Sequence, residues 1–180
     1  MKISFDKNTA DKIKADCITF FVYEDKKLYD EKIRYIQRIL KVKISDFSLA
    51  DFSGKEEQIQ ILYTSKYRIL LSGLGKNENI TLQKIRIANS SSAKKANSLK
   101  SKKIAIEVIQ ESKISEGAEE IAKAEVIGCI LGNYHFGKYF SKKEKKEQIV
   151  LKEAVYFADK NTDLKVLKEI ERGVKSGGAI

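Results

Sequence analysis

The stretch Leu70–Thr81, LLSGLGKNENIT, joins an apolar run to the start of a helix through two glycines. The run begins at Tyr67 and is nearly free of polar residues, which is typical of a strand buried inside a sheet. Thr81 is a favourable N-cap, because its side-chain oxygen can accept a hydrogen bond from a backbone N–H of the first helical turn. A buried strand, a glycine turn and a helix in succession predict an α/β protein.

Strand and helix patterns alternate along the rest of the chain. Cys17–Tyr23, CITFFVY, is β-branched and aromatic, as expected of a strand buried on both faces. The two strands that flank Ser65-Lys66 are close enough in sequence to form a hairpin. The predicted strands are 1–7, 17–23, 58–64, 67–74, 102–109 and 149–157, and the predicted helices are 30–41, 81–99, 115–134 and 162–175. This order predicts one domain, residues 1–180, with a mixed, mainly parallel sheet between helical layers (α/β/α).

The third predicted helix has two unusual features. Gly128 and Gly132 are four residues apart and so share one face, where each costs about 1 kcal/mol of helix propensity. We expect close packing against another backbone to compensate. Ile127, Leu131 and Tyr134 widen the apolar stripe of this helix, so we expect neighbouring elements to surround it.

Composition places the chain among globular proteins. Of its 180 residues 42% are apolar and 33% are charged, and no apolar run approaches the roughly 20 residues of a membrane-spanning helix. The N-terminal MKISFDKNTADKIK carries acids and no apolar core, which argues against a signal peptide. We therefore expect a cytoplasmic protein with no membrane partner, in which Cys17 and Cys129 are buried free thiols. One histidine and two isolated cysteines argue against a structural zinc site.

Gly73, Gly75 and Lys76 raise the question of a phosphate-binding loop. Such a loop follows the pattern G-x-x-x-x-G-K-[ST], whereas asparagine follows Lys76 here. The dinucleotide pattern G-x-G-x-x-G also fails, because Glu78 occupies the position of its third glycine. We interpret Gly73 and Gly75 as turn residues at the end of a strand, and the binding of a ligand there stays open.

Two further segments carry residue types that serve catalysis or metal binding. His135 lies among aromatic residues and could act as a general base, but no serine or cysteine nucleophile lies in a recognisable motif. We interpret it as a structural histidine. Asn161-Thr162-Asp163 opens the last predicted helix, where its residues are ordinary N-caps, as Ser115 is for the previous helix.

The formal net charge of +10 suggests the hypothesis of nucleic-acid binding. Basic residues beside aromatic ones can hold single-stranded nucleic acid, and Tyr139 and Phe140 lie within a lysine cluster. A solvated loop explains the same cluster, and an excess of lysine by itself explains solubility. The lysines of this cluster are Lys138, Lys142, Lys143, Lys145 and Lys146.

Three segments, in this order, resemble motifs of the leucyl (cytosol) aminopeptidase family. Residues 52–58, FSGKEEQ, resemble its F-x-G-K turn, and residues 68–76, RILLSGLGK, resemble its R-x-L-L-x-G-L-G-K strand and turn. Residues 128–143, GCILGNYHFGKYFSKK, resemble the most specific motif, G-x-x-L-G-x-Y-x-F-x-x-Y-x-S-K-K. The resemblance is to the N-terminal domain of that family and spans essentially the whole chain, although residues 1–50 match only in pattern.

This resemblance implies a macro-domain-like fold and a non-catalytic role. Members of the family are two-domain metallopeptidases that release N-terminal residues, leucine preferentially, and typically assemble as hexamers. Their catalytic domain holds two divalent metals, usually zinc, with manganese or magnesium able to substitute. No position up to Ile180 matches those metal ligands, so we assign no catalytic, cofactor-binding or metal-binding residue to this chain. The expected partners are its own catalytic domain and the other subunits.

Two other roles stay open at this point. Some bacterial members of the family also bind DNA, and the positive net charge is compatible with that role. The third hypothesis is a stand-alone macro-like domain that binds or hydrolyses ADP-ribose, since the Gly73–Gly75 turn follows a strand, where α/β sheets usually bind ligands.

Overall fold

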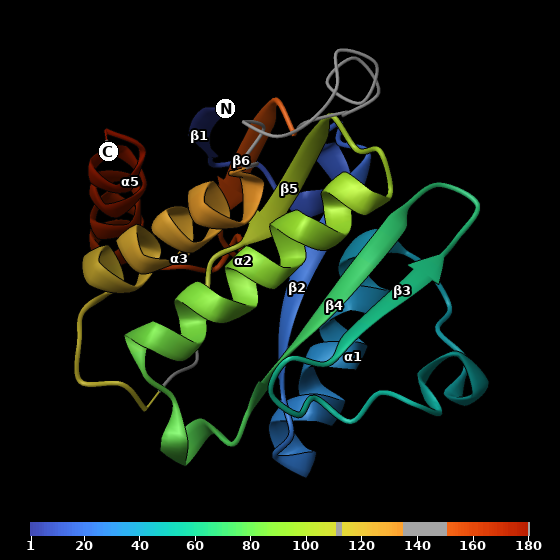
Figure 1. The fold of residues 1–180 in the computed structure, drawn as a ribbon. Coiled ribbons are helices and arrows are strands. Elements are labelled where there is room, and N and C mark those ends of the chain that lie inside the picture. The colour runs from blue at the N-terminus through green and yellow to red at the C-terminus, as the bar shows by residue number, and fades with distance from the viewer. Residues whose placement is uncertain (111–112, 135–150, 180) are drawn as a thin grey trace.

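The chain folds into a mixed β-sheet with helices on both faces (Figure 1). The computed structural model describes residues 1–110, 113–134 and 151–179. The described strands are β1 (Lys2–Asp6), β2 (Cys17–Tyr23), β3 (Ile59–Tyr63), β4 (Arg68–Gly75), β5 (Lys103–Glu107) and β6 (Glu153–Phe157). The helices are α1 (Lys26–Leu40), α2 (Leu82–Ser98), α3 (Ala118–Asn133) and α5 (Leu164–Gly178). These elements follow the predicted order, and the α/β prediction is confirmed.

The sheet is parallel except at one edge. Its strand order is β1-β6-β5-β2-β4-β3, and within the described residues only β3 and β4 pair in an antiparallel sense. These two strands form the hairpin predicted around Ser65-Lys66, where the N–H of Thr64 donates to the carbonyl of Tyr67 at 2.9 Å. The mixed, mainly parallel sheet is therefore confirmed.

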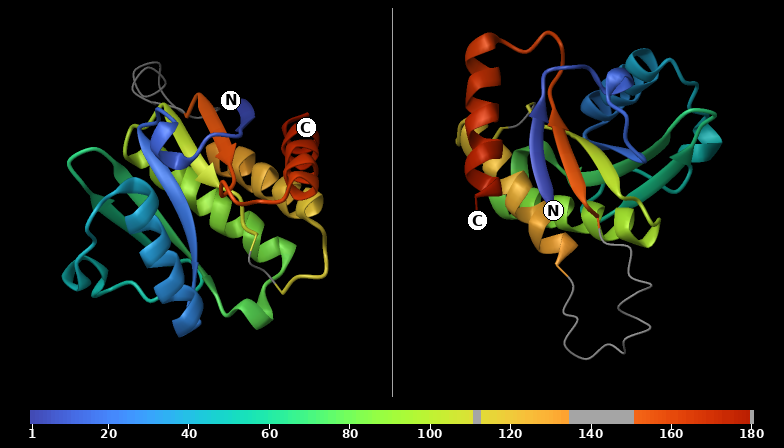
Figure 2. Two further views of the ribbon diagram at one scale, coloured as in Figure 1. Left: turned by 180° about the vertical axis from the view of Figure 1, so that it is seen from behind. Right: turned by 90° about the horizontal axis from the view of Figure 1, so that it is seen from above.

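Strand β2 divides the core into two apolar clusters. All seven of its residues are buried, as predicted for a strand covered on both faces. Its even-numbered residues Ile18, Phe20 and Val22 belong to the cluster that α1 covers. Its odd-numbered residues Cys17 and Phe21 belong to the cluster on the opposite face, which α2, α3 and α5 cover (Figure 2).

Helices α2 and α3 pack with their backbones in contact. A Cβ at Gly128 would lie 2.3 Å from the carbonyl oxygen of Arg86, and a Cβ at Gly132 would lie 2.2 Å from that of Ser90. The predicted close packing of these glycines is thus confirmed. The expectation that neighbours surround α3 is wrong for its last turn, because Leu131 is 60% exposed. Among the described elements, the sheet, α2 and α5 cover the other sides of α3 and do not cover this one.

Helix ends differ in detail from the sequence prediction. Helix α1 begins at Lys26, four residues before the predicted start, and its first turn includes Leu28 and Tyr29, which pack against the core. The N-cap of α3 is Gly117 rather than Ser115, whose hydroxyl instead bonds the carboxylate of Glu116. The cap at Thr81 is confirmed, since its side chain accepts a hydrogen bond from the N–H of Lys84.

Replacing Gly128 should destabilise the protein. The Gly128→Ser variant adds a Cβ that collides with the backbone of α2, so its free energy of unfolding should fall by about 1–3 kcal/mol despite the better helix propensity of serine. Gly117→Ser is the matched control, because no atom lies within 4 Å of a Cβ there and serine is a preferred N-cap. Urea denaturation measures both, and equal stabilities would contradict the packing argument.

Candidate functional site

The Gly73–Gly75 turn is filled by the chain's own backbone. The N–H groups of Gly73 and Gly75 donate to the carbonyls of Gln58 and Gly54, at 2.8 and 2.9 Å. A Cβ at Gly73 would lie 1.9 Å from the carbonyl oxygen of Lys55, and Gly75 has a φ of 73°, in the region that favours glycine. Both N–H groups that a phosphate would need are therefore in use, which supports the interpretation of these glycines as turn residues.

Asn77 connects this turn to the ends of two neighbouring strands. Its backbone N–H donates to the carboxylate of Asp25, just after β2, at 2.7 Å. Its side-chain oxygen accepts from the N–H of Lys113, in the segment after β5, at 3.0 Å. The carboxyl ends of parallel strands are the usual ligand site of an α/β sheet. Here the ends of β2, β4 and β5 are joined by hydrogen bonds within the protein.

A polar cleft of about 590 Å³ lies next to these strand ends, on the face of the sheet that α1 covers. One wall is α1, and the other wall is formed by the residues that end or follow β5 and β6. Because these walls are at least 69 residues apart in sequence, only the folded sheet brings them together. The cleft is lined by Glu31, Lys32, Arg34, Tyr35, Arg38, Glu107, Val108, Gln110, Asp159 and Asn161.

An ion pair and a tyrosine ring hold several of the charged groups of this cleft. The Lys32 ammonium lies 2.9 Å from the Glu107 carboxylate, which is 5% exposed as a residue. The Lys32 ammonium and the Arg38 guanidinium also lie over the ring of Tyr35, at 5.1 and 5.8 Å from its centroid. Burial raises the pKa of Tyr35, and the Glu107 and Asp159 carboxylates that accept its hydrogen bonds raise it further. Tyr35 is thus a neutral donor between two carboxylates, an arrangement that orders the cleft and supplies no activated base.

Glu125 is a fully buried acid on α3. One of its carboxyl oxygens accepts a hydrogen bond from the N–H of Ile109 at 2.8 Å, and the other has no hydrogen-bond partner among the described residues. Burial raises the pKa of Glu125 well above its ordinary value, and the nearby Glu107 adds to the shift. Sequence analysis missed both acids. The sequence signal that could have found them is a glutamate among apolar residues: Glu125 lies in the apolar stripe of a helix, and Glu107 lies in an apolar strand.

The other sequence candidates have structural roles or fall outside the described residues. Cys17 and Cys129 are buried and free, as predicted, and burial raises the pKa of each thiol to about 12. Asp163 caps α5 by accepting from the N–H of Lys165 at 2.7 Å, which confirms the cap interpretation. His135 and the lysine cluster from Lys138 to Lys146 lie outside the described residues.

Neither a metal site nor a membrane span is found in the part of the chain that the structure describes. Across residues 1–110, 113–134 and 151–179, no group of three or more His, Cys, Asp or Glu side chains could hold a metal ion. The helices of the same ranges are all too short or too polar to cross a bilayer.

The sheet order and helical layers define an α/β domain that is shared with other enzymes of known structure. A tomato leucine aminopeptidase mutant superposes with a TM-score of 0.69 over 96% of this chain and 35% of its own, at 18% identity. The bottromycin maturation enzyme BotP gives a TM-score of 0.61 over 92% of this chain and 30% of its own, at 17% identity. At this level of identity the likeness shows the fold.

Sequence comparison identifies the family. Residues 19–143 match the N-terminal domain of the cytosol aminopeptidase family, and the chain belongs to that family. A probable cytosol aminopeptidase of Sulfurihydrogenibium sp. is 30% identical over 178 residues, which are 96% of this chain and 34% of that protein. One of Persephonella marina is 36% identical over 132 residues, 71% of this chain and 26% of that protein. The chain therefore spans about a third of the length of the curated relatives it matches.

The Lys32–Glu107 pair should be a large contributor to stability in the cleft. Lys32→Met leaves a buried carboxylate without its cation, so the free energy of unfolding should fall by about 2–4 kcal/mol. Lys26→Met is the matched control, because its pair with Asp30 is at the surface and should be worth less than about 1 kcal/mol. Glu107→Gln added to Lys32→Met should recover most of the loss in urea denaturation. A loss equal to that of the control would contradict the assignment.

Glu125→Gln should make stability less dependent on pH. The folded-state pKa of Glu125 lies above the ordinary value of 4.5, so the folded protein keeps a proton that the unfolded chain releases. This contribution to stability is complete below pH 4.5 and is lost as the pH rises toward the folded-state pKa. Relative to Glu125→Gln, the wild type should therefore lose stability from about pH 4.5 upward in urea denaturation. Glu120→Gln, an exposed change on the same helix, should leave the wild-type pH profile unchanged.

Proposed function

We propose that this chain is the non-catalytic N-terminal domain of a cytoplasmic leucyl aminopeptidase. The observation that carries the proposal is the match of residues 19–143 to the N-terminal domain of the cytosol aminopeptidase family. The likeness of the fold to a leucine aminopeptidase over 96% of the chain supports it. The complete enzyme would release N-terminal amino acids from peptides, with leucine preferred, by two-metal hydrolysis.

The metals of that reaction do not fit the residues of this domain. Two-metal hydrolysis needs bridging carboxylates and a polarised water between metals about 3.5–4 Å apart. Among the described residues the buried acids are already committed: Glu107 pairs with Lys32, and burial raises the pKa of Glu125 and favours its protonated form. The thiols of Cys17 and Cys129, with pKa values of about 12, are protonated at pH 7 and are poor ligands. Zinc, manganese or magnesium would therefore be bound by the catalytic domain.

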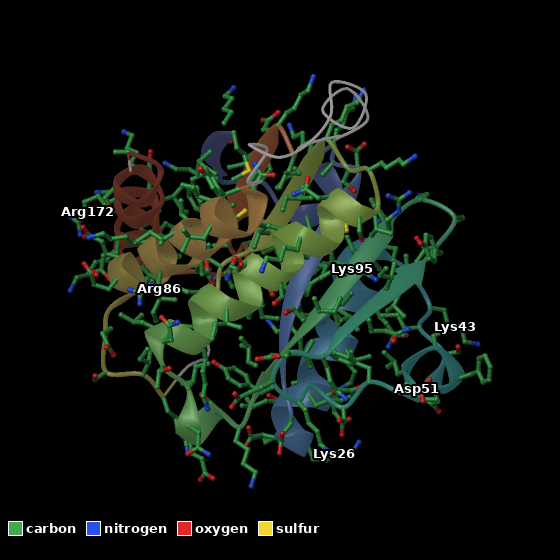
Figure 3. The ribbon with its side chains drawn as sticks, in the orientation of Figure 1. Lys26, Lys43, Asp51, Arg86, Lys95 and Arg172 are labelled. Carbon is green, nitrogen blue, oxygen red and sulfur yellow. The ribbon has the colours of Figure 1, made fainter. Side chains whose placement is uncertain are left out.

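The role of this domain would be to pack on the catalytic domain, support assembly of the hexamer and limit access of substrates. The family match favours this role over DNA binding as the main function. Lys26, Lys43, Arg86 and Arg172 project from different elements around the molecule (Figure 3). Affinity for duplex DNA grows with the number of phosphates that basic residues contact at once, which favours a gathered surface over a spread one.

Aminopeptidase assays on two forms of the protein test this proposal. The 180-residue chain should not hydrolyse a leucine chromogenic substrate in the presence of zinc, manganese or magnesium, because its described residues supply no metal site. The full product of the gene should hydrolyse it, and a chelator should abolish that activity as the control. Activity of the 180-residue chain alone would overturn the non-catalytic role. Activity in neither form would contradict the aminopeptidase role and favour DNA or ADP-ribose binding.

A further inference from the structure

The outer side of α3 changes from charged to apolar along its length. Its first half carries Glu120 and Lys123, and its second half carries Ile127, Leu131 and Tyr134, spaced four and three residues apart on one side of the helix. Leu131 is 60% exposed, Tyr134 is 71% exposed and Ile127 is half-buried. These three residues form the α3 patch. Adjacent large apolar side chains in solvent are typical of a contact surface.

The elements that pack on α3 are fixed by glycines and leave the α3 patch uncovered. On one side, Gly128 and Gly132 bring the backbone of α2 within contact distance. On another side, α5 approaches through its own glycines, Gly173 and Gly177, each of which lies against α3. A third side faces the sheet and is buried. The α3 patch therefore lies on the remaining side, which no described element of this domain occupies.

Helix α5 ends beside the second half of α3, next to β1. A Cβ at Gly173 would lie 2.2 Å from the carbonyl oxygen of Glu119, and one at Gly177 would lie 2.8 Å from the Cβ of Val126. The contact points advance in the same direction along both helices, so α3 and α5 run parallel. Helix α5 ends beside Val126, and Leu131 lies little more than one turn further along α3.

The relatives show which protein segment would meet this surface. The matching part of the Sulfurihydrogenibium protein is 34% of its length, and the family places this domain at the N-terminus. In such an enzyme the chain beyond α5 leaves from beside Val126, between one and two turns of α3 before Leu131. Leu131 and Tyr134 are also the leucine and tyrosine of the G-x-x-L-G-x-Y motif. The fold uses the glycines of that motif to pack α2, whereas the leucine is 60% exposed and the tyrosine 71% exposed.

We propose that the α3 patch is the docking surface for the catalytic domain of the same aminopeptidase chain. This inference rests on the proposed function. The catalytic domain would present an apolar pocket or face to Leu131 and to the ring of Tyr134, whose hydroxyl can bond at the rim. Glu120 and Lys123, on the charged half of α3, lie outside the buried centre of this contact.

Thiol labelling of a Leu131→Cys variant tests the docking. The native cysteines give little background, because both are buried and their thiol pKa values are raised to about 12. In the 180-residue chain a maleimide should label the engineered thiol quickly. In the active enzyme that carries the catalytic domain, labelling should be at least tenfold slower. Phe47→Cys is the control, since Phe47 is 90% exposed on the turn Asp46–Leu49 and should react equally fast in both forms.

Three outcomes separate this proposal from its alternatives. Equally fast labelling of the Leu131→Cys variant in both forms would overturn the proposal that the α3 patch is the docking surface. It would not bear on the aminopeptidase activity of the complete enzyme. Protection that disappears when the subunits are dissociated would assign the α3 patch to another subunit and also overturn the proposal. Failure of the proposed function would show differently, as the lack of leucine-releasing activity in the full product of the gene.

A second variant, Leu131→Glu, tests the same contact without labelling. It should leave the thermal unfolding of the 180-residue chain unchanged, because the side chain is in solvent there. In the complete enzyme it should split unfolding into two transitions, one for each domain. A single transition at the wild-type temperature in the complete enzyme would contradict the proposal.

Discussion

Backbone contact through glycine sets the positions of the helices on one face of the sheet. Gly128 and Gly132 seat α3 on α2, and Gly173 and Gly177 of α5 seat that helix on α3, all at distances that no side chain could occupy. Helices this close bury little side-chain surface between them, but they place the apolar side of α3 firmly against the sheet. The same packing leaves the opposite side of α3 exposed, so the contact that builds the core also determines which surface is available to a partner.

The end of the sheet uses glycine in the same way. Gly73 and Gly75 allow residues Gly54–Glu56 to lie against the end of β4, with a hydrogen bond from Gly75 to Gly54, and Gly54 lies against Tyr23 at the end of β2. A phosphate-binding loop would leave these N–H groups pointing into solvent toward a ligand. Here backbone carbonyl groups of the protein accept these hydrogen bonds, where a ligand would accept them in a phosphate site. The glycines allow the segment before β3 to approach the end of β4 closely. The G-x-G pattern is thus explained by packing.

Local sequence pattern was enough to predict the helices and strands. Ion pairing and side-chain exposure could not be predicted in this way, because they depend on contacts between residues far apart in sequence. The apolar run of Cys17–Tyr23 and the cap at Thr81 are local signals, so the order of strands and helices could be predicted. The pairing of Glu107 with Lys32 joins residues 75 positions apart, and no local pattern announces it. The exposure of a side chain is equally hard to predict from local sequence. Leu131 continues an apolar stripe, but whether a neighbouring element covers it depends on where α2 and α5 pack.

The titratable groups of this domain are arranged for structure rather than for proton transfer. A catalytic acid or base works best with a pKa near the working pH. Burial instead raises the pKa of Tyr35, and it raises the pKa of both cysteine thiols to about 12, far from neutral pH. Glu125 is sealed between α3 and the loop after β5, out of reach of a substrate. Under the proposal above, what this domain offers the enzyme is a folded shape with the exposed α3 patch, which is the property that a docking domain needs.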